Sequence, residues 1–250
     1  MVDVLKSQVA QDFYTESLKI LKKSKIPFMV GGTFAVNAYI GINRPTKDLD
    51  IFCKAGDYPK ILNAFAQAGF KTQVTDERWL AKVFKGRHFF DLIFNSSIAV
   101  MPVTDEWLKE SQTLNIIGME AMALPVAELI WSKSLVQSRE KFDGNDIAHL
   151  ILVRGNLIDW KRLFSYMDPH WEILLIHLLR FRFIYPSERE IIPKWLINEL
   201  MQRLNNQLTM PTSKEKVCRG RLVSTGDFEI DVKEWGFTDI IGWNNDRKKT

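Results

Sequence analysis

The chain has 250 residues, with 34 Lys and Arg against 30 Asp and Glu and a formal net charge of +4. Hydrophobic residues make up 46% and charged residues 26% of it, a globular composition that excludes a disordered, collagen-like or disulfide-scaffold chain. We expect one or two compact domains at this length. Because the charge is nearly balanced, bulk charge gives no sign of a dedicated polyanion binder.

Three features favour a soluble, cytoplasmic protein. Cys53 and Cys218 are isolated, without a CxxC motif or a metal-ligand spacing, as is typical of a reducing compartment. Charged residues interrupt the N-terminus before any apolar run, so no signal peptide is visible. The uncharged stretch 26–43 reaches the length of a membrane helix, but Pro27 and Gly41 divide it into shorter elements. We therefore expect no membrane partner.

The first 120 residues alternate between helical and strand patterns. Apolar spacing and turn residues predict helices over 7–24, 33–39 and 58–68, and strands over 27–30, 48–53, 70–74, 80–84 and 89–94. Thr33 is expected to cap the second of these helices. The strands 80–84 and 89–94 are expected to pair across the polar turn 85–88. Such alternation is typical of an α/β or α+β fold.

From Pro125 onward the apolar period becomes helical. The predicted helices cover 125–137, 145–154, 160–167, 171–184 and 190–208. The polar segment 209–216 is a predicted linker, and the aromatic residues beyond it, Trp243 among them, suggest a tail that docks onto the body. We therefore expect an α/β domain over 1–120, a helical domain over 121–210 and a docking tail over 211–250.

Asp48 and Asp50 form an acidic pair on the predicted strand 48–53. Alternate strand residues share a face, so the two carboxylates point the same way, about 7 Å apart, while Leu49 and Ile51 point into the core. Carboxylates held this close repel one another unless a cation lies between them. Such a pair suits a divalent metal ion.

A third carboxylate follows the same reasoning. Asp91 is the one polar residue in the apolar run 89–94, and a lone buried carboxylate is costly. Asp91 should therefore have a hydrogen-bonding or ionic partner. If its strand neighbours the strand of Asp48 and Asp50, all three acids converge.

The Gly31-Gly32 pair adds a phosphate-binding element. It lies after an apolar strand and before a helix, where free backbone N–H groups make a ready place for a phosphate. Glycine pairs and Asp-x-Asp pairs are each weak signals alone. Their order along the chain, with Arg44 and Lys47 beside the acidic pair, makes a stronger joint signal.

These residues resemble the nucleotidyltransferase superfamily that shares the polymerase-beta palm. The matching motifs are Val30-Gly31-Gly32, Asp48-Leu49-Asp50 and the later strand acid Asp91. The form of residues 44–50 is most similar to the branch that contains the abortive-infection type IV toxin nucleotidyltransferases and uncharacterised bacterial relatives. The resemblance implies an α+β fold, with a mixed sheet flanked by helices in the catalytic domain over 1–120 and a mostly α-helical domain after it.

The second half carries a further likeness to that branch. Lys133 falls on the apolar stripe of helix 125–137, where a charged residue is unusual unless it faces a cleft or an acid. Lys133 with Asp143-x-x-Asp146 resembles the Lys and Asp-x-x-Asp motifs of those relatives, a possible site in the second domain. The alternative is a lysine whose ammonium reaches solvent and an acidic cap at a helix start.

The resemblance implies a Mg²⁺-dependent transfer. Asp48, Asp50 and Asp91 would be catalytic and would bind two Mg²⁺ ions, and a hydroxyl acceptor would attack the α-phosphorus of an NTP such as ATP with release of pyrophosphate. The implied nucleotide-binding residues are Gly31, Gly32, Thr33, Arg44, Lys47 and Lys133. The acceptor could be RNA, protein or a small molecule.

Two other functions remain open. One is a non-catalytic nucleotide-binding module of the same fold. The other is the toxin component of a toxin-antitoxin pair, which would have an antitoxin as its partner.

Overall fold

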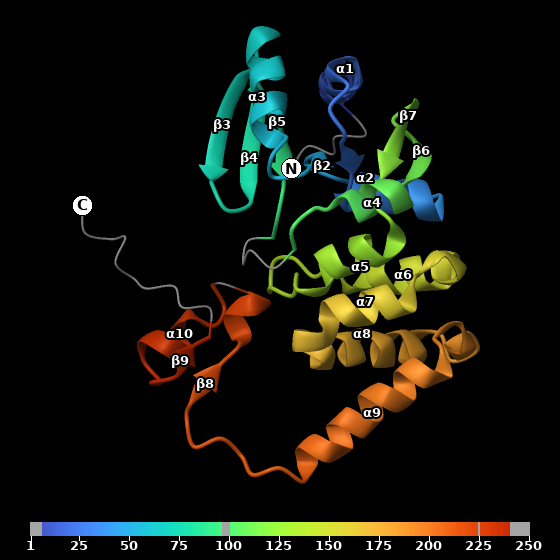
Figure 1. Cartoon of the computed structure of the whole chain (residues 1–250), viewed down its shortest axis with the longest axis vertical. Helices are drawn as coiled ribbons and strands as arrows, with labels where there is room; N and C mark the ends of the chain where they lie inside the picture. Colours follow the sequence, from blue (N-terminus) through green and yellow to red (C-terminus); the bar gives the residue numbers. More distant parts are fainter. Residues whose placement is uncertain (1–6, 97–100, 225, 241–250) are drawn as a thin grey trace. The chain divides into compact units, whose positions relative to one another are not determined.

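The computed structural model describes residues 7–96, 101–224 and 226–240. Within it the chain divides into two compact units (Figure 1). The first comprises Met1–Ile130 and Val153–Asp159, and the second comprises Trp131–Leu152 and Trp160–Thr250. The end of the expected tail, 241–250 with Trp243, lies outside the described residues, and the three-part division from the sequence stays a prediction.

The first unit is built on a seven-stranded mixed sheet with the order β3-β4-β5-β2-β1-β7-β6. Its strands are β1 Met29–Val30, β2 Asp50–Phe52, β3 Lys71–Asp76, β4 Leu80–Lys85, β5 His88–Ile93, β6 Gln112–Ile116 and β7 Met119–Ala123. The pairs β2–β5 and β1–β7 are parallel, and the other pairs are antiparallel. This sheet and its helices confirm the predicted α+β class.

Two helices cover one face of the sheet. The helices of this unit are α1 Gln8–Ser24, α2 Gly32–Ile40, α3 Tyr58–Gln67 and α4 Asp105–Glu110. α1 and α3 contact each other and the strands (Figure 1), and Phe13 and Phe65 join Phe90 and Leu92 of β5 in one core. Because strand residues alternate between faces, Asp91, which stands between Phe90 and Leu92, lies on the opposite face.

Most predicted elements are present, with ends that differ by a few residues, but three details differ. The Thr33 cap is wrong: α2 begins at Gly32 with Gly31 as its N-cap, and no side chain bonds the cap. α4 and the β6–β7 hairpin were not predicted. That hairpin turns at Ile117 and Gly118, which both have positive φ angles, a geometry that glycine favours.

The second unit is mostly helical. α5 Val126–Ser134 continues into it from the first unit, whereas α6 Gly144–Arg154 begins in it and ends in the first unit. α7 Trp160–Met167, α8 Trp171–Ile184 and α9 Lys194–Leu208 follow. α8 contacts both α7 and α9. Short 3₁₀ helices of this unit lie at Asp168–His170, Arg189–Ile191 and Gly220–Leu222, and another, Gly155–Leu157, belongs to the first unit. Among the described residues, no helix has the length and apolar character needed to span a membrane.

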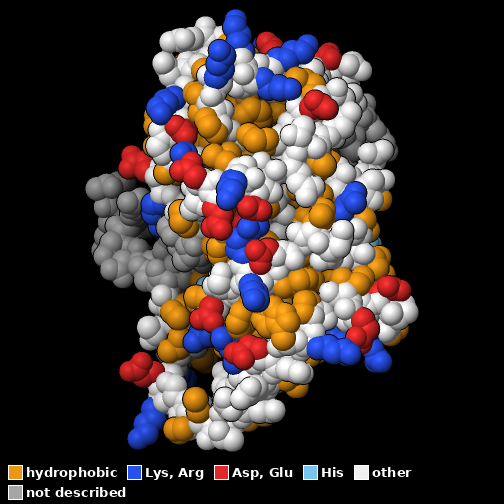
Figure 2. All heavy atoms as spheres, turned by 45° about the vertical axis from the view of Figure 1, so that its right-hand side comes forward, with side chains coloured by type: hydrophobic (Ala, Val, Ile, Leu, Met, Phe, Trp, Pro, Cys, Tyr) orange, Lys and Arg blue, Asp and Glu red, His pale blue; other side chains and the backbone are white. Residues whose placement is uncertain are grey.

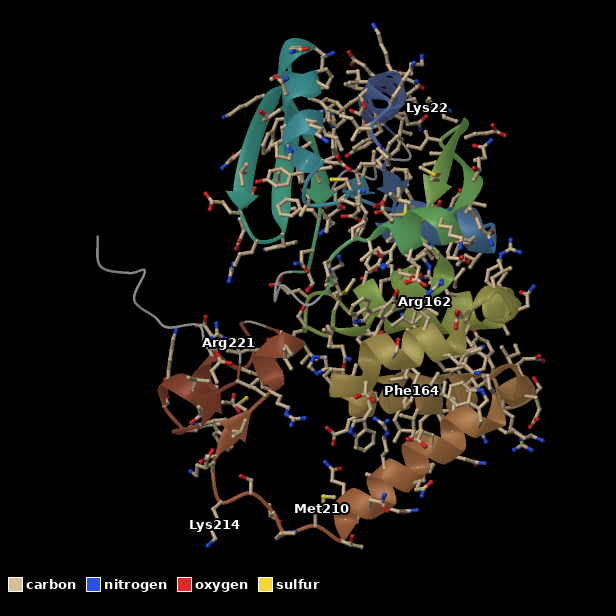
Figure 3. The ribbon with its side chains drawn as sticks, viewed as in Figure 1. Lys22, Arg162, Phe164, Met210, Lys214 and Arg221 are labelled. Carbon is tan, nitrogen blue, oxygen red and sulfur yellow. The ribbon has the colours of Figure 1, made fainter. Side chains whose placement is uncertain are left out.

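A small C-terminal segment completes the second unit. It contains the parallel pair β8 Val217–Cys218 and β9 Thr238–Asp239 and the short helix α10 Glu229–Lys233. Arg221 lies in this segment (Figure 3), and its guanidinium forms a largely buried ion pair with Asp239. The Gln137 N–H donates to the Val223 carbonyl oxygen at 3.2 Å, which links the segment to the rest of its unit.

Charges of both signs are interspersed on the surface. On the face shown in Figure 2, Lys and Arg side chains alternate with Asp and Glu side chains. This pattern agrees with the small net charge of +4.

Candidate active site

Asp50 and Asp91 face each other across neighbouring strands. β2 and β5 run parallel with these two residues as register partners, and the Asp91 N–H donates to the Leu49 carbonyl oxygen at 3.0 Å. Paired residues of adjacent strands point to the same face and lie about 5 Å apart. The structure therefore brings these two predicted acids together, on the sheet face opposite α1 and α3.

The glycine turn lies directly against the Asp50 carboxylate. A Cβ atom on Gly32, whose φ is +56°, would lie 1.8 Å from Oδ2 of Asp50. The Gly31 N–H donates to the Asp50 carbonyl oxygen at 2.9 Å and so extends the sheet. Since the first N–H groups of a helix have no acceptor within the helix, Gly32 and Thr33 present the N–H groups suited to an anion here. The N–H of Gly31, predicted to share that role, is engaged in the sheet instead.

Tyr14 of α1 connects the backbone segments that carry the acids. Its buried hydroxyl lies 3.2 Å from the carbonyl oxygen of Phe89 and 3.3 Å from that of Lys47. Burial, and then the negative charges of Asp48, Asp50 and Asp91, raise the pKa of Tyr14 far above its usual value. The phenol therefore stays a neutral donor, and all three acids act electrostatically on the same side chain.

Lys82 of β4 supplies the partner that Asp91 was expected to have. Its Nζ lies 2.6 Å from Oδ1 of Asp91 and 4.3 Å from the centroid of the Phe89 ring. Sequence reasoning missed Lys82, although the strands 80–84 and 89–94 were expected to pair. With a two-residue turn at Gly86 and Arg87, strand register alone puts Lys82 opposite Asp91.

Two further unpredicted residues hold the loop that carries Arg44 and Lys47. The Asn37 amide accepts the Arg44 N–H and donates to the Arg44 carbonyl oxygen, both at 3.0 Å. The Thr46 hydroxyl donates to the Asp48 carbonyl oxygen at 3.1 Å. A buried polar residue inside a short apolar helix, as Asn37 is, was the signal that could have revealed this anchor.

Lys133, Asp143 and Asp146 form a cluster of their own in the second unit. The Lys133 ammonium lies 3.0 Å from Asp143 and 2.8 Å from Asp146, and its side chain is only 5% exposed. Lys133 shares the buried stripe of α5 and faces two acids, as the sequence suggested for a charged residue there. The two carboxylates bind the Lys133 ammonium in this structure. The expected contact between Lys133 and a nucleotide stays a prediction.

The donor chemistry of the first unit fits a hard divalent cation. Within residues 7–96, 101–224 and 226–240, no three His, Cys, Asp or Glu side chains are grouped closely enough to hold a metal ion by themselves. Mg²⁺, however, is usually bound through one or two carboxylates together with water and substrate phosphates. Asp50 and Asp91 provide such a carboxylate pair next to a helix N-terminus, and Asp48 lies two residues before β2.

A thiol nucleophile does not belong to this site. Cys53 and Cys218 are both free and buried. Burial, and then the negative charge of Asp57, raises the pKa of the Cys53 thiol to about 12, so it stays protonated at neutral pH.

A protein-family model matches residues 15–92 and is described as aminoglycoside-2''-adenylyltransferase. The match includes Gly32, Asp48, Asp50, Lys82 and Asp91. No curated protein sequence matches the chain significantly.

Several solved structures are similar to part of this chain. They include the lincosamide antibiotic adenylyltransferase LnuA with lincomycin bound (16% identity, 56% of this chain and 94% of that chain, TM-score 0.41). ANT(2")-Ia in complex with adenylyl-2"-tobramycin is 13% identical to this chain, and the match covers 79% of this chain and 99% of that chain with a TM-score of 0.42. JHP933 from Helicobacter pylori is 14% identical to this chain, and the match covers 82% of this chain and 99% of that chain with a TM-score of 0.42.

Proposed function

The chain belongs to the nucleotidyltransferase superfamily, and on that premise we propose that it transfers a nucleoside monophosphate from an NTP to a hydroxyl group of a small molecule. The observation that carries the proposal is the register pairing of Asp50 with Asp91 beside Gly32. It joins an acidic pair to a helix N-terminus within the segment that matches the family model.

Asp50 and Asp91, with Asp48 nearby, are the residues that would hold Mg²⁺ in this proposal. When bound, the metal would supply positive charge that stabilises the attacking and leaving oxygens of an in-line displacement. The resemblance implies two such ions, and that number is part of the proposal.

The chain's own groups would bind and orient the triphosphate. The N–H groups of Gly32 and Thr33 point from the start of α2, where the helix dipole favours an anion. Arg44 and Lys47 lie on the adjacent loop, which Asn37 fixes to α2. Charge-assisted contacts from these two cations would hold the phosphate chain in one orientation.

A small-molecule acceptor is favoured over RNA or protein. The support is the family description, an adenylyltransferase that acts on aminoglycosides, and it also favours ATP as donor. The RNA and protein acceptors, the toxin function and the antitoxin partner expected from the sequence gain no support from these comparisons.

Product formation tests the proposal directly. The protein is incubated with Mg²⁺, each α-³²P-labelled NTP in turn, and a panel of aminoglycosides, lincosamides and simple aminocyclitols. We expect a labelled acceptor with the wild-type chain and none with Asp50→Asn. Equal labelling by both proteins would refute the proposal.

A non-catalytic nucleotide-binding module is the second candidate. The ion pair between Lys82 and Asp91 favours it, because this contact neutralises one of the acids. Calorimetric titration separates the two functions: NTP binding without product formation from any acceptor in the panel would favour the module.

A further inference from the structure

Lys82 belongs to a polar row that crosses the sheet through the candidate site. Lys82 of β4 pairs in register with Asp91 of β5, which pairs in register with Asp50 of β2. Register partners share a face, so all three side chains lie on the face opposite α1 and α3. The Lys82 ammonium therefore stands at the Asp91 end of the acidic pair.

The Lys82 ammonium is held closely in this position. It lies 2.6 Å from Oδ1 of Asp91 and above the Phe89 ring, and the two charged side chains are only 24% and 16% exposed. Partial burial limits screening by water and salt, so the pair is stronger than an exposed surface ion pair. The contact occupies one of the two oxygens through which Asp91 would bind a cation.

We propose that Lys82 is a resident counter-ion of Asp91 that a divalent cation must displace. This inference rests on the carboxylate metal site of the proposed function. Two cations on one carboxylate repel each other strongly where the effective dielectric is low. Lys82 therefore weakens metal binding to the free protein and keeps Asp91 in place until a metal arrives.

The chemical consequence concerns the order of loading. A triphosphate brings negative charge that offsets the repulsion between Lys82 and the incoming metal. The metal is thus bound much more tightly with the nucleotide than without it. The displaced ammonium remains on the same sheet face, available to an anionic oxygen of the substrate.

Direct Mn²⁺ binding, measured by electron paramagnetic resonance without nucleotide or acceptor, tests this inference. We expect Lys82→Met to bind Mn²⁺ at least about tenfold more tightly than wild type, because one opposing charge is removed. Lys85→Met is the matched control: Lys85 lies on the other face of the same strand and pairs with Glu16 of α1. Lys85→Met should bind Mn²⁺ as tightly as wild type does. Lys82→Arg, which keeps the positive charge, should do the same.

The Asp91→Asn background separates direct competition from a general field effect. If Lys82 acts chiefly through Asp91, Lys82→Met should tighten Mn²⁺ binding much less in Asp91→Asn than in the wild-type background. Equal or weaker binding by Lys82→Met, the same tightening in both backgrounds, or no Mn²⁺ binding by any variant would overturn the inference. Because no substrate is present, failure of the transferase assay does not alter these outcomes.

A second measurement on the wild-type side chain avoids dependence on the Met variant. Lysines are reductively ¹³C-methylated, which keeps their charge, and the Lys82 signal is identified by its loss in Lys82→Arg. Mg²⁺ should shift this signal in the wild-type background and leave it in place in Asp91→Asn. An unchanged Lys82 signal at saturating Mg²⁺ would contradict displacement.

Discussion

Gly32 is the residue at which backbone conformation and site chemistry meet. Its φ of +56° is costly for any residue with a side chain, and the space that a Cβ would fill is taken by Oδ2 of Asp50. Two independent constraints therefore require glycine. The first is the positive φ angle at the turn into α2, and the second is the space that the Asp50 carboxylate occupies.

Gly32→Ala separates these constraints when it is compared with Gly41→Ala. Gly41 also has a positive φ, +72°, but nothing lies within 4 Å of its Cβ position. Both variants should lose about 1 kcal/mol of stability from backbone strain. Only Gly32→Ala should also lose about a hundredfold or more in transferase activity, because it moves Asp50.

Thermal unfolding and initial rates measure the two effects. Equal activity in the two alanine variants would show that contact between Gly32 and Asp50 does not matter to the reaction.

Residues that act locally could be predicted from the sequence, and residues that act through register could not. Asp48, Asp50 and Gly32 carry their signal in short motifs. Lys82 lies three residues before the predicted turn 85–88, and its position opposite Asp91 is apparent only when β4 pairs with β5. Tyr14 is 75 residues from Phe89, whose carbonyl oxygen lies 3.2 Å from its hydroxyl, so no local pattern indicates the contact.

At the scale of elements, α5 and the start of α6 are connected by charge. The Lys133 ammonium reaches two carboxylates, and all three side chains are at most 13% exposed. Desolvation makes such a cluster costly to assemble, but removing one partner costs more, because charges of one sign then remain buried.

Lys133→Met should therefore destabilise the protein by about 3–5 kcal/mol. The matched control is Lys54→Met, which removes a still shorter contact, 2.6 Å to the exposed Asp105, and should have little effect. Urea unfolding measures both. A small effect in Lys133→Met, close to that of the control, would show that the buried acids find other partners or protonate at little cost.

α8 carries a buried histidine that links stability to pH. His177 is 3% exposed, and its Nε2 lies 2.9 Å from the Ser134 carbonyl oxygen. Burial lowers the pKa of His177 below its ordinary value of 6.5, and the nearby Arg180 acts in the same direction. The folded state therefore favours the neutral ring, whereas the unfolded state binds a proton near pH 6.5.

The sign of the pH effect follows from this difference. Below about pH 6.5 the unfolded state holds more protons, so the free energy of unfolding falls as the pH falls, by at most about 1.4 kcal/mol per pH unit for one group. His177→Gln keeps a donor for Ser134 but cannot titrate, so its stability should depend less on pH. Some pH dependence of stability should remain in His177→Gln, because the pKa of His170 is also lowered. Identical pH dependence from 7 to 5 in both proteins would contradict this role.

Elements with a strong apolar period were predictable, and those defined by their neighbours were not. The helices α7 and α8 have the ends that the sequence predicts. β1 has only two residues, yet it lies between β2 and β7 in the sheet, an order that no local pattern contains. β6 and β7 were missed because they contain few of the β-branched residues that are typical of strands.

At the scale of the whole molecule, a small net charge coexists with a local group of acids. The net charge is +4, and Asp48, Asp50 and Asp91 are brought into one part of the first unit, where Lys82 forms an ion pair with Asp91. A triphosphate therefore meets repulsion at this place unless a cation accompanies it. We therefore expect the protein to bind a nucleoside triphosphate only when a divalent metal ion is present.

Hydrogen exchange with Mg²⁺ and ATP tests this dependence in the full chain. A ligand at a hundred times its Kd stabilises the folded state by about 2.7 kcal/mol. We expect slower exchange in the peptides that contain 29–53 and 88–93. The helices α8 and α9 of the second unit should change little, because the proposed phosphate contacts lie in the first unit. Chelation of the metal with EDTA, or the Asp50→Asn substitution, should remove most of the protection. Equal protection by ATP in EDTA would show that the acids do not govern nucleotide entry, and protection confined to 160–208 would place the nucleotide in the other unit.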